Sequence, residues 1–216
     1  MYKFLQPLLL VAIVCITSCK PNVNPKAVEL NKKAFKILLF DPNYVLSDAE
    51  RSKTALAILD SATALEPAYN SAYINKLSSL IILKRYKEAL KTIDIVLKND
   101  PESFNTHIKG GVIARDYLQN EPLAIKYFTK SNQLATESAK GNNENQLQSY
   151  YHVTFSLVYL KGKAAALDYL NEVKARYANN QKALDDIKFF QKLLEQRPVN
   201  KQENMNWFTS YSTIDY

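Results

Sequence analysis

The chain has little cysteine and little glycine, and each shortage excludes a class of site. Its 2 cysteines, Cys15 and Cys19, both precede residue 20, so the remainder has no thiol pair for a disulfide or a zinc site. The 4 glycines are too scattered to form a phosphate-binding loop or a nucleophile elbow. They are Gly110, Gly111, Gly141 and Gly162.

Histidine is equally scarce. His107 and His152 have no cysteine or acidic neighbours at metal-site spacing, so we expect both to be partly exposed and hydrogen-bonded. Asp185 and Asp186 are adjacent, and adjacent helical side chains point about 100° apart, which favours a solvated face over an acid–base pair. We therefore expect no enzyme activity, no catalytic residues, no metal and no cofactor.

The chain carries a net charge of +7, but its lysines are spread along the sequence. Nucleic-acid readers cluster such charges, so we expect no nucleic-acid partner. A dispersed basic surface attracts anionic lipid, glycan or acidic protein instead.

The first residues read as an export signal. A positive start at Lys3 is followed by the apolar run Leu8 to Ile16, which is far shorter than the roughly 20 residues that span a bilayer. The run ends in Ile16-Thr17-Ser18-Cys19, which resembles the lipobox of bacterial lipoproteins. The resemblance implies a signal peptide over 1–18, acylation of Cys19 with a palmitate-type lipid, and a tether over 19–25.

The residues after Cys19 bear on the compartment. In lipoproteins an aspartate directly after the acylated cysteine often retains the protein at the inner membrane, and an acidic cluster there directs surface export in some lineages. This chain has Lys20 at that position and no acid through Asn24. The resemblance therefore implies a lipid anchor in the outer membrane, facing the periplasm.

A repeat organises the middle of the chain. Five residues recur 34 positions further along: Lys53, Ala55, Leu56, Asp60 and Pro67 return as Lys87, Ala89, Leu90, Asp94 and Pro101. A 34-residue period in a helical pattern is typical of the tetratricopeptide repeat (TPR), a helix–turn–helix unit that buries its apolar face only by stacking on neighbours. The chain resembles this family over roughly residues 26–175.

The resemblance implies an all-α fold: a TPR-like right-handed α-solenoid of about four helix pairs plus a C-terminal capping helix, over residues 26–198. Expected helices are 27–40, 48–65, 70–83, one ended by Pro101, 104–118, one beginning at Glu121, 146–160, one following Gly162, and 181–196. Thr136 to Asn145 reads as a polar loop, and Ser47-x-x-Glu50 has the spacing of a capping box.

Core positions follow from helical spacing. Ala55 and Ala89 are small residues where two helices approach, and Gly110-Gly111 indicates a second close approach. We expect Tyr73, Leu77 and Leu80 in the core of the second unit. In the first helix we expect one buried face, formed by Val28, Ala34, Phe35 and Leu38.

The first helix of each unit lines the concave face of such a solenoid. The groove residues we expect there are Ile74, Asn75, Ser78, Ile82, Asn105, Ile108, Lys109, Val112 and Arg115. A mixed apolar and polar groove suits a helical or extended peptide; the alternative is that this face is only solvated scaffold. Asn75 fits the family's carboxylate clamp, but Phe40 and Tyr44 in the first unit do not, so that docking role is unsupported.

These features favour a non-catalytic, membrane-anchored TPR adaptor that mediates protein–protein interaction in the bacterial cell envelope. The alternative is a glycan- or solute-capture lipoprotein related in plan to starch-binding TPR lipoproteins, which carry an inserted lobe for which this chain has no room.

The final stretch, 199–216, is a polar tail with four aromatic residues: Trp207, Phe208, Tyr211 and Tyr216. Exposed aromatic side chains leave about 150–250 Å² of burial unused, so we expect the tail to pack on Leu184, Ile187 and Phe190 of the last helix. Docking to a partner and disorder are the alternatives.

Overall fold

The computed structural model describes residues 23–39, 46–140 and 146–196 of the 216-residue chain, and within these ranges every regular element is helical. The elements are α1 (Pro25–Leu39), α2 (Asp48–Leu65), α3 (Asn70–Ile82), α4 (Tyr86–Asn99), α5 (Phe104–Val112), the π-helical turn η1 (Ile113–Tyr117), α6 (Glu121–Lys140), α7 (Gln146–Lys161), α8 (Lys163–Arg176) and α9 (Gln181–Gln196).

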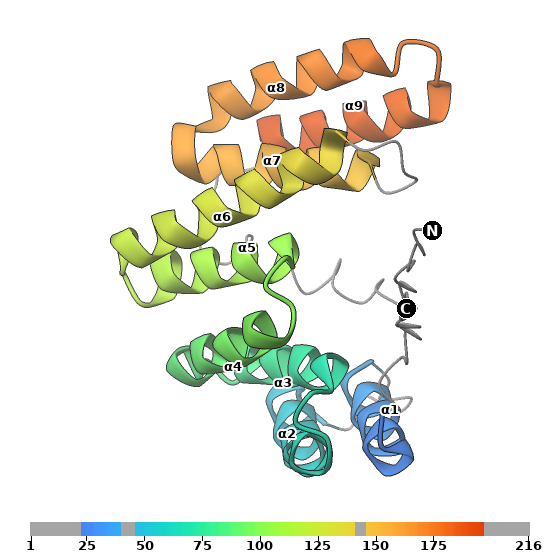
Figure 1. Ribbon diagram of the computed structural model, residues 1–216, viewed down its shortest axis with the longest axis vertical. Coiled ribbons are helices and arrows are strands. Elements are labelled where there is room, and N and C mark those ends of the chain that lie inside the picture. The colour runs from blue at the N-terminus through green and yellow to red at the C-terminus, as the bar shows by residue number, and fades with distance from the viewer. Residues whose placement is uncertain (1–22, 40–45, 141–145, 197–216) are drawn as a thin grey trace, which may run out of the picture.

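The helices stack as pairs. Each helix packs against its neighbour in the chain, and α1 also contacts α3 just as α5 contacts α7, which gives an odd-numbered and an even-numbered layer. Figure 1 shows the pairs piled along the long axis, with α9 laid against α8 at the end of the stack. The expected all-α solenoid of four helix pairs with a final capping helix is confirmed.

Local sequence signals account for the helix ends. Ser47 caps α2 as predicted, since its hydroxyl accepts from the Glu50 N–H while the Glu50 carboxylate accepts from the Ser47 N–H. Ser103 caps α5 in the same way, with its hydroxyl accepting from Thr106 N–H. Two turns between paired helices carry a non-glycine residue with positive φ, Lys84 at 57° and Gln119 at 53°.

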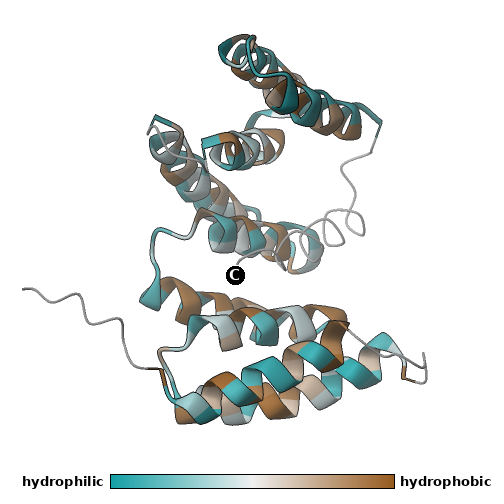
Figure 2. Cartoon of the chain, turned by 90° about the vertical axis from the view of Figure 1, so that its right-hand side faces the viewer, coloured by the Kyte–Doolittle hydropathy of each residue, from teal (hydrophilic) through white to brown (hydrophobic). Residues whose placement is uncertain are grey.

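The repeated small residues lie at the centre of the core. Ala55, Ala89 and Ala124 are fully buried, each in the second helix of its unit. The predicted core residues Leu77 and Leu80 are buried between neighbouring pairs. Figure 2 shows the resulting pattern, with apolar stripes on the helices interrupted by polar ones.

The turn η1 accounts for one irregularity of the repeat. The starts of α3 and α5 are 34 residues apart, but the starts of α4 and α6 are 35 apart, as are Lys84 and Gln119. The extra residue therefore lies between Phe104 and Glu121, where the Leu118 N–H bonds the Ile113 carbonyl at 3.1 Å in the wider π pattern. A π-helical turn absorbs one residue without breaking the helix.

Two sequence predictions are wrong. The predicted loop from Thr136 is helical to Lys140, because Ala135 and Ala139 bury against the next pair and the Tyr150 hydroxyl donates to the Ala139 carbonyl at 3.3 Å. In α1 the buried face consists of Ala27, Asn31 and Ala34. Of the predicted face only Ala34 is buried, and the larger Val28, Phe35 and Leu38 are half-buried, because the close approach to α2 admits small residues.

Several predictions lie outside the described residues. They concern the signal peptide and Cys19, the connection 40–45 and the tail 199–216. Among the helices that the structure does describe, none combines the length and apolarity that crossing a membrane requires. The same ranges hold no group of three or more metal-ligating side chains.

Candidate functional site

The orientation of α5 defines the inner surface of the stack. Gly110 and Gly111 face α6, because a Cβ on them would lie 3.0 Å from the Tyr127 ring and 2.6 Å from the Phe128 ring. Phe104 faces α7, with its ring centroid 4.5 Å from that of His152. At 100° per residue the face opposite α6 consists of Asn105, Lys109, Val112 and Asp116.

The same face recurs in α3, one period earlier: Ser71, Asn75, Ser78 and Ile82 lie 34 residues before the four residues of α5. In α3 the stripe is open, since Ser71 and Ile82 are exposed and the two residues between them are half-buried. We call these eight residues the concave stripe. Ser71 and Asp116 were absent from the predicted groove, although the repeat spacing indicates them.

Asn75 is held from the side by the first unit. Its Nδ2 donates to Asn31 Oδ1 at 2.8 Å, and Asn31 Nδ2 donates to the Tyr69 hydroxyl at 3.2 Å. Asn31 is buried and α1 packs against α3, which fixes the amide plane of Asn75. The sequence did not indicate Asn31, because the two asparagines are 44 residues apart and not 34.

The other predicted groove residues lie at the edges of the stripe. Ile108 and Val112 are both fully buried in the core and Lys109 is 7% exposed, so none of these three predicted groove residues is open; Ile108 lies on the side of α5 that turns toward α7. Ile74, one period earlier, is half-buried on the corresponding side of α3. Helical spacing alone did not separate the open face from the one covered by the next pair.

Arg115 joins the stripe to α7. Its guanidinium lies 5.2 Å from the centroid of the Tyr159 ring, Nη1 donates to the Tyr159 carbonyl at 3.4 Å, and Nε lies 3.4 Å from the Glu121 carboxylate. A cation over an aromatic face is stabilised by the ring quadrupole. Arg115 is therefore largely engaged with its own chain.

Aromatic residues surround this end of the stripe. Tyr117 stacks on Tyr86 at a centroid distance of 4.1 Å, and burial raises the pKa of Tyr117 to about 12. Tyr159 stacks on Phe128 at 4.3 Å, and its burial raises the pKa of its phenol. Both phenols are neutral at physiological pH, so neither adds a negative charge beside the stripe.

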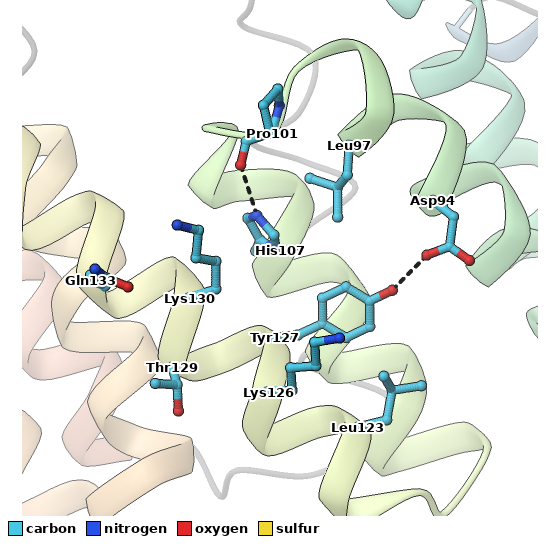
Figure 3. A pocket seen from close by; sticks show the side chains of 10 residues that line it. All are labelled: Asp94, Leu97, Pro101, His107, Leu123, Lys126, Tyr127, Thr129, Lys130 and Gln133. Atoms are coloured by element: carbon cyan, nitrogen blue, oxygen red, sulfur yellow. Dashed lines mark hydrogen bonds between the residues drawn. The ribbon is translucent and has the colours of Figure 1, made fainter.

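A second concavity lies between α4, α5 and α6 (Figure 3). It is a pocket of about 670 Å³ whose lining includes Asp94, His107, Lys126, Tyr127 and Lys130. The Tyr127 hydroxyl donates to the Asp94 carboxylate at 2.9 Å, and His107 Nε2 lies 3.1 Å from the Pro101 carbonyl, to which it donates. The first hydrogen bond joins α6 to α4, and the second joins α5 to the turn that precedes it, so both stabilise the packing of the helices.

Burial dominates the electrostatics of His107. Desolvation and the nearby Lys130 lower its pKa, while the bond to Pro101 and the charge of Asp100 oppose them. The prediction of a partly exposed histidine is wrong, because the ring lies beside Tyr127 of α6 at a centroid distance of 6.0 Å; its predicted hydrogen bond is present. His152 is half-buried and bonds the Gln148 carbonyl at 2.8 Å.

Comparison with known proteins gives structural likeness without sequence relatives. No protein family model matches the chain, and no curated protein matches it. The fold resembles a putative kinesin light chain of Podosopora anserina with nearly identical TPR-like repeats: the TM-score is 0.55 at 9% identity, over 85% of this chain and 92% of that one.

Two further solved structures have lower TM-scores. MamA from Desulfovibrio magneticus RS-1 gives 0.47 at 14% identity over 90% of this chain and 99% of that one. YrrB, described as a TPR protein with an unusual peptide-binding site, gives 0.41 at 20% identity over 88% and 93%. A TM-score below 0.5 does not establish that two proteins share a fold. The helix pairs and the kinesin light chain comparison together show that the described part of the chain is a TPR-like α-solenoid.

Proposed function

We propose that this chain is a non-catalytic adaptor of the bacterial cell envelope, anchored by a lipid on Cys19, whose concave stripe binds an extended peptide segment of a partner protein. The observation that carries the proposal is the oriented amide of Asn75 on an open helix face. The fold supports the proposal because helical solenoids present extended concave surfaces for binding.

Asn75 has hydrogen-bonding capacity to spare. A primary amide carries two N–H donors and one carbonyl acceptor. Only one donor of Asn75 is used, toward Asn31, and among the described residues none donates to its Oδ1. The spare N–H and Oδ1 match the acceptor and donor that an extended peptide backbone presents.

The residues flanking Asn75 supply the rest of a peptide surface. Ile82 is 39% exposed at one end of the stripe, Ser71 is exposed at the other, and Ser78 is half-buried between Asn75 and Ile82. Apolar contact at Ile82 contributes affinity, while the serines and Asn75 fix the position of the peptide. Backbone hydrogen bonds joined to side-chain contacts are the usual basis of extended-peptide recognition.

Membrane attachment rests on the sequence. Ile16-Thr17-Ser18-Cys19 follows an apolar run that is too short to span a bilayer, and Lys20 favours the outer membrane by resemblance to other lipoproteins. The first described helix begins at Pro25, six residues after Cys19. The helical stack would then lie close to the membrane surface.

The test is peptide binding with matched asparagine variants. Peptides are selected against the purified chain by display, and their dissociation constants are measured by calorimetry. We expect Asn75→Ala to weaken binding about tenfold, the equivalent of about 1.4 kcal/mol.

The control is Asn99→Ala, which removes an amide in α4 that bonds only Asn70 at 2.9 Å among the described residues. Equal affinities for wild type and both variants would contradict the proposal. Selection of glycans but no peptides would favour the alternative of glycan capture.

A further inference from the structure

The helix α1 exposes a row of lysine side chains. Its sequence holds four lysines and one glutamate, a larger excess of one sign than any other helix of the described chain carries. The buried positions Ala27, Asn31 and Ala34 define the face that packs on α2 and α3. At about 100° per residue the other side of the helix consists of the exposed residues Lys26, Glu29, Lys32, Lys33 and Lys36. We call these five residues the basic face.

Three of these lysines have no counter-charge in the described chain. Lys26 Nζ lies 3.0 Å from the Glu29 carboxylate, so the charges of this pair cancel. Lys32, Lys33 and Lys36 form no ion pair or hydrogen bond with any residue that the structure describes. Three uncompensated positive charges therefore lie together on the outer side of α1.

The helix that packs most extensively on α1 does not supply the missing acid. Each acidic residue of α2 is engaged within its own unit or with the next one, in the pairs Asp48–Arg51 and Asp60–Lys76 and in the Glu50 cap. Glu66, which follows α2, accepts from the Asn24 N–H at 3.2 Å, beside the start of α1 and not beside its lysines. The basic face thus has room for a negatively charged surface from outside the chain.

The basic face also lies at the anchored end of the stack. Figure 1 shows α1 and α2 at one end of the stack and α8 and α9 at the other. Pro25, the first residue of α1, is six residues after Cys19, and six residues reach about 20 Å when fully extended. A lipid on Cys19 would hold the start of α1 within that distance of the membrane surface.

We propose that the basic face of α1 binds the anionic lipid headgroups of the membrane in which Cys19 is anchored, so that the solenoid stands on its first helix. This orientation rests on the lipid anchor of the proposed function. Lysine side chains attract anionic lipids over about a Debye length, roughly 8 Å at physiological salt. The concave stripe, which runs from α3 to α5, then leads away from the membrane.

An acidic protein is the other class of ligand that such a face attracts. The short tether favours lipid, because it keeps the membrane surface beside α1 at all times, whereas a protein has to be captured from solution. Three lysines are too few to hold the chain by themselves at physiological salt, so the basic face orients a chain that the lipid retains.

Vesicle binding measures the basic face without the anchor. The probe is the mature chain, residues 19–216, with Cys19→Ser so that no lipid is attached, mixed at low ionic strength with vesicles of phosphatidylglycerol or of phosphatidylcholine. We expect co-sedimentation with phosphatidylglycerol, none with phosphatidylcholine, and release as the salt concentration is raised. Equal binding to the two lipids, or binding to neither, would overturn the proposal.

Two changes in α1 should act in opposite directions. Each lysine near an anionic surface contributes about a fivefold change in affinity, so Lys32→Gln, Lys33→Gln and Lys36→Gln together should weaken binding to phosphatidylglycerol about 100-fold. Glu29→Gln should strengthen it about fivefold, because this change removes the one acid of the helix and frees Lys26. Damage to the fold does not strengthen binding, so Glu29→Gln decides the test if the triple variant loses helicity. Unchanged or weaker binding by Glu29→Gln would overturn the proposal.

Matched controls lie elsewhere on the stack. Lys87→Gln, Lys91→Gln and Lys98→Gln together remove three exposed lysines of α4. Glu102→Gln removes an exposed acid in the turn before α5. Both controls should bind vesicles nearly as the wild type does. Effects as large as those of the α1 variants would show that the net charge of the chain, and not the basic face, binds the lipid, and would reject the proposal.

The basic face and the lipid anchor fail separately. Mass spectrometry of the chain extracted from its own membrane decides whether Cys19 is acylated. Acylation of Cys19, with α1 variants that bind vesicles as the wild type does, would reject the basic face and keep the anchor. A chain that is not acylated, yet binds phosphatidylglycerol through α1, would reject the anchor and keep the basic face.

Discussion

Gly111 of α5 lies directly against the ring of Phe128 in α6, so close that a Cβ on Gly111 would stand 2.6 Å from the nearest ring carbon. Phe128 has no room to move, because it is 1% exposed and stacks on Tyr159 at 4.3 Å. The glycine therefore sets the distance between the two helices of the third unit.

Gly111→Ala should lower the free energy of unfolding. Overpacking a core costs about 1–3 kcal/mol, and the better helix propensity of alanine returns only about 1 kcal/mol of that. Gly110→Ala is the matched comparison, since its Cβ would meet the Tyr127 ring at the less severe distance of 3.0 Å. Denaturant titration measures both, and a Gly110 variant less stable than the Gly111 variant would contradict this packing.

The two faces of α3 should respond differently to truncation. Leu77→Ala removes a buried side chain between neighbouring pairs and should cost about 2–5 kcal/mol through the cavity it leaves. Ile82→Ala, in the same helix but exposed, should stay within about 0.5 kcal/mol. Similar melting temperatures for the two variants would mean that the buried and open faces of α3 are misassigned.

The stability of the third unit should depend on pH through His107. Burial lowers its folded-state pKa below the ordinary value of about 6.5, so the unfolded chain binds more protons as the pH falls. The stabilisation is fully present above the unfolded-state pKa and is lost as the pH drops toward the folded-state pKa.

Melting temperatures across this range measure the effect. His107→Gln should flatten the fall in stability between neutral and mildly acidic pH, whereas His152→Gln, which leaves His107 in place, should keep it. The same acid sensitivity in wild type and His107→Gln would show that another group is responsible.

Membrane attachment should depend on Cys19. Cys19→Ser removes the acceptor for acylation, and each buried CH₂ of an acyl chain contributes about 0.8 kcal/mol of membrane affinity. Fractionation should find the variant soluble or unprocessed, while Cys15→Ser, within the same segment, stays with the membrane. A Cys19 variant that remains in the membrane fraction would exclude this anchor.

The sequence predicted the fold well where repeat spacing and local signals agree. Ala55 and Ala89 occupy equivalent buried positions, because a 34-residue period keeps the length of the repeat unit and the buried face of its helices the same from one unit to the next. The cap at Ser47 depends on residues within one turn, so it too could be read locally.

Features that depend on tertiary packing could not be predicted in this way. The last turn of α6 is polar in sequence and is held by contacts to α7, such as that between Ser138 and Ser149 at 2.8 Å. The one sign of the π-helical turn in the sequence is that Ala89 and Ala124 are 35 residues apart and not 34. Asn31 reaches Asn75 through the packing of α1, which no sequence spacing indicates.

The central claim is that a partner peptide binds the concave stripe and not the pocket between α4 and α6. A photoreactive residue placed at Ser78 lies on the stripe, and one at Thr129 lies in the lining of the pocket. With a selected peptide bound, we predict cross-linking from position 78 and none from position 129. Cross-linking from position 129 alone would contradict the account.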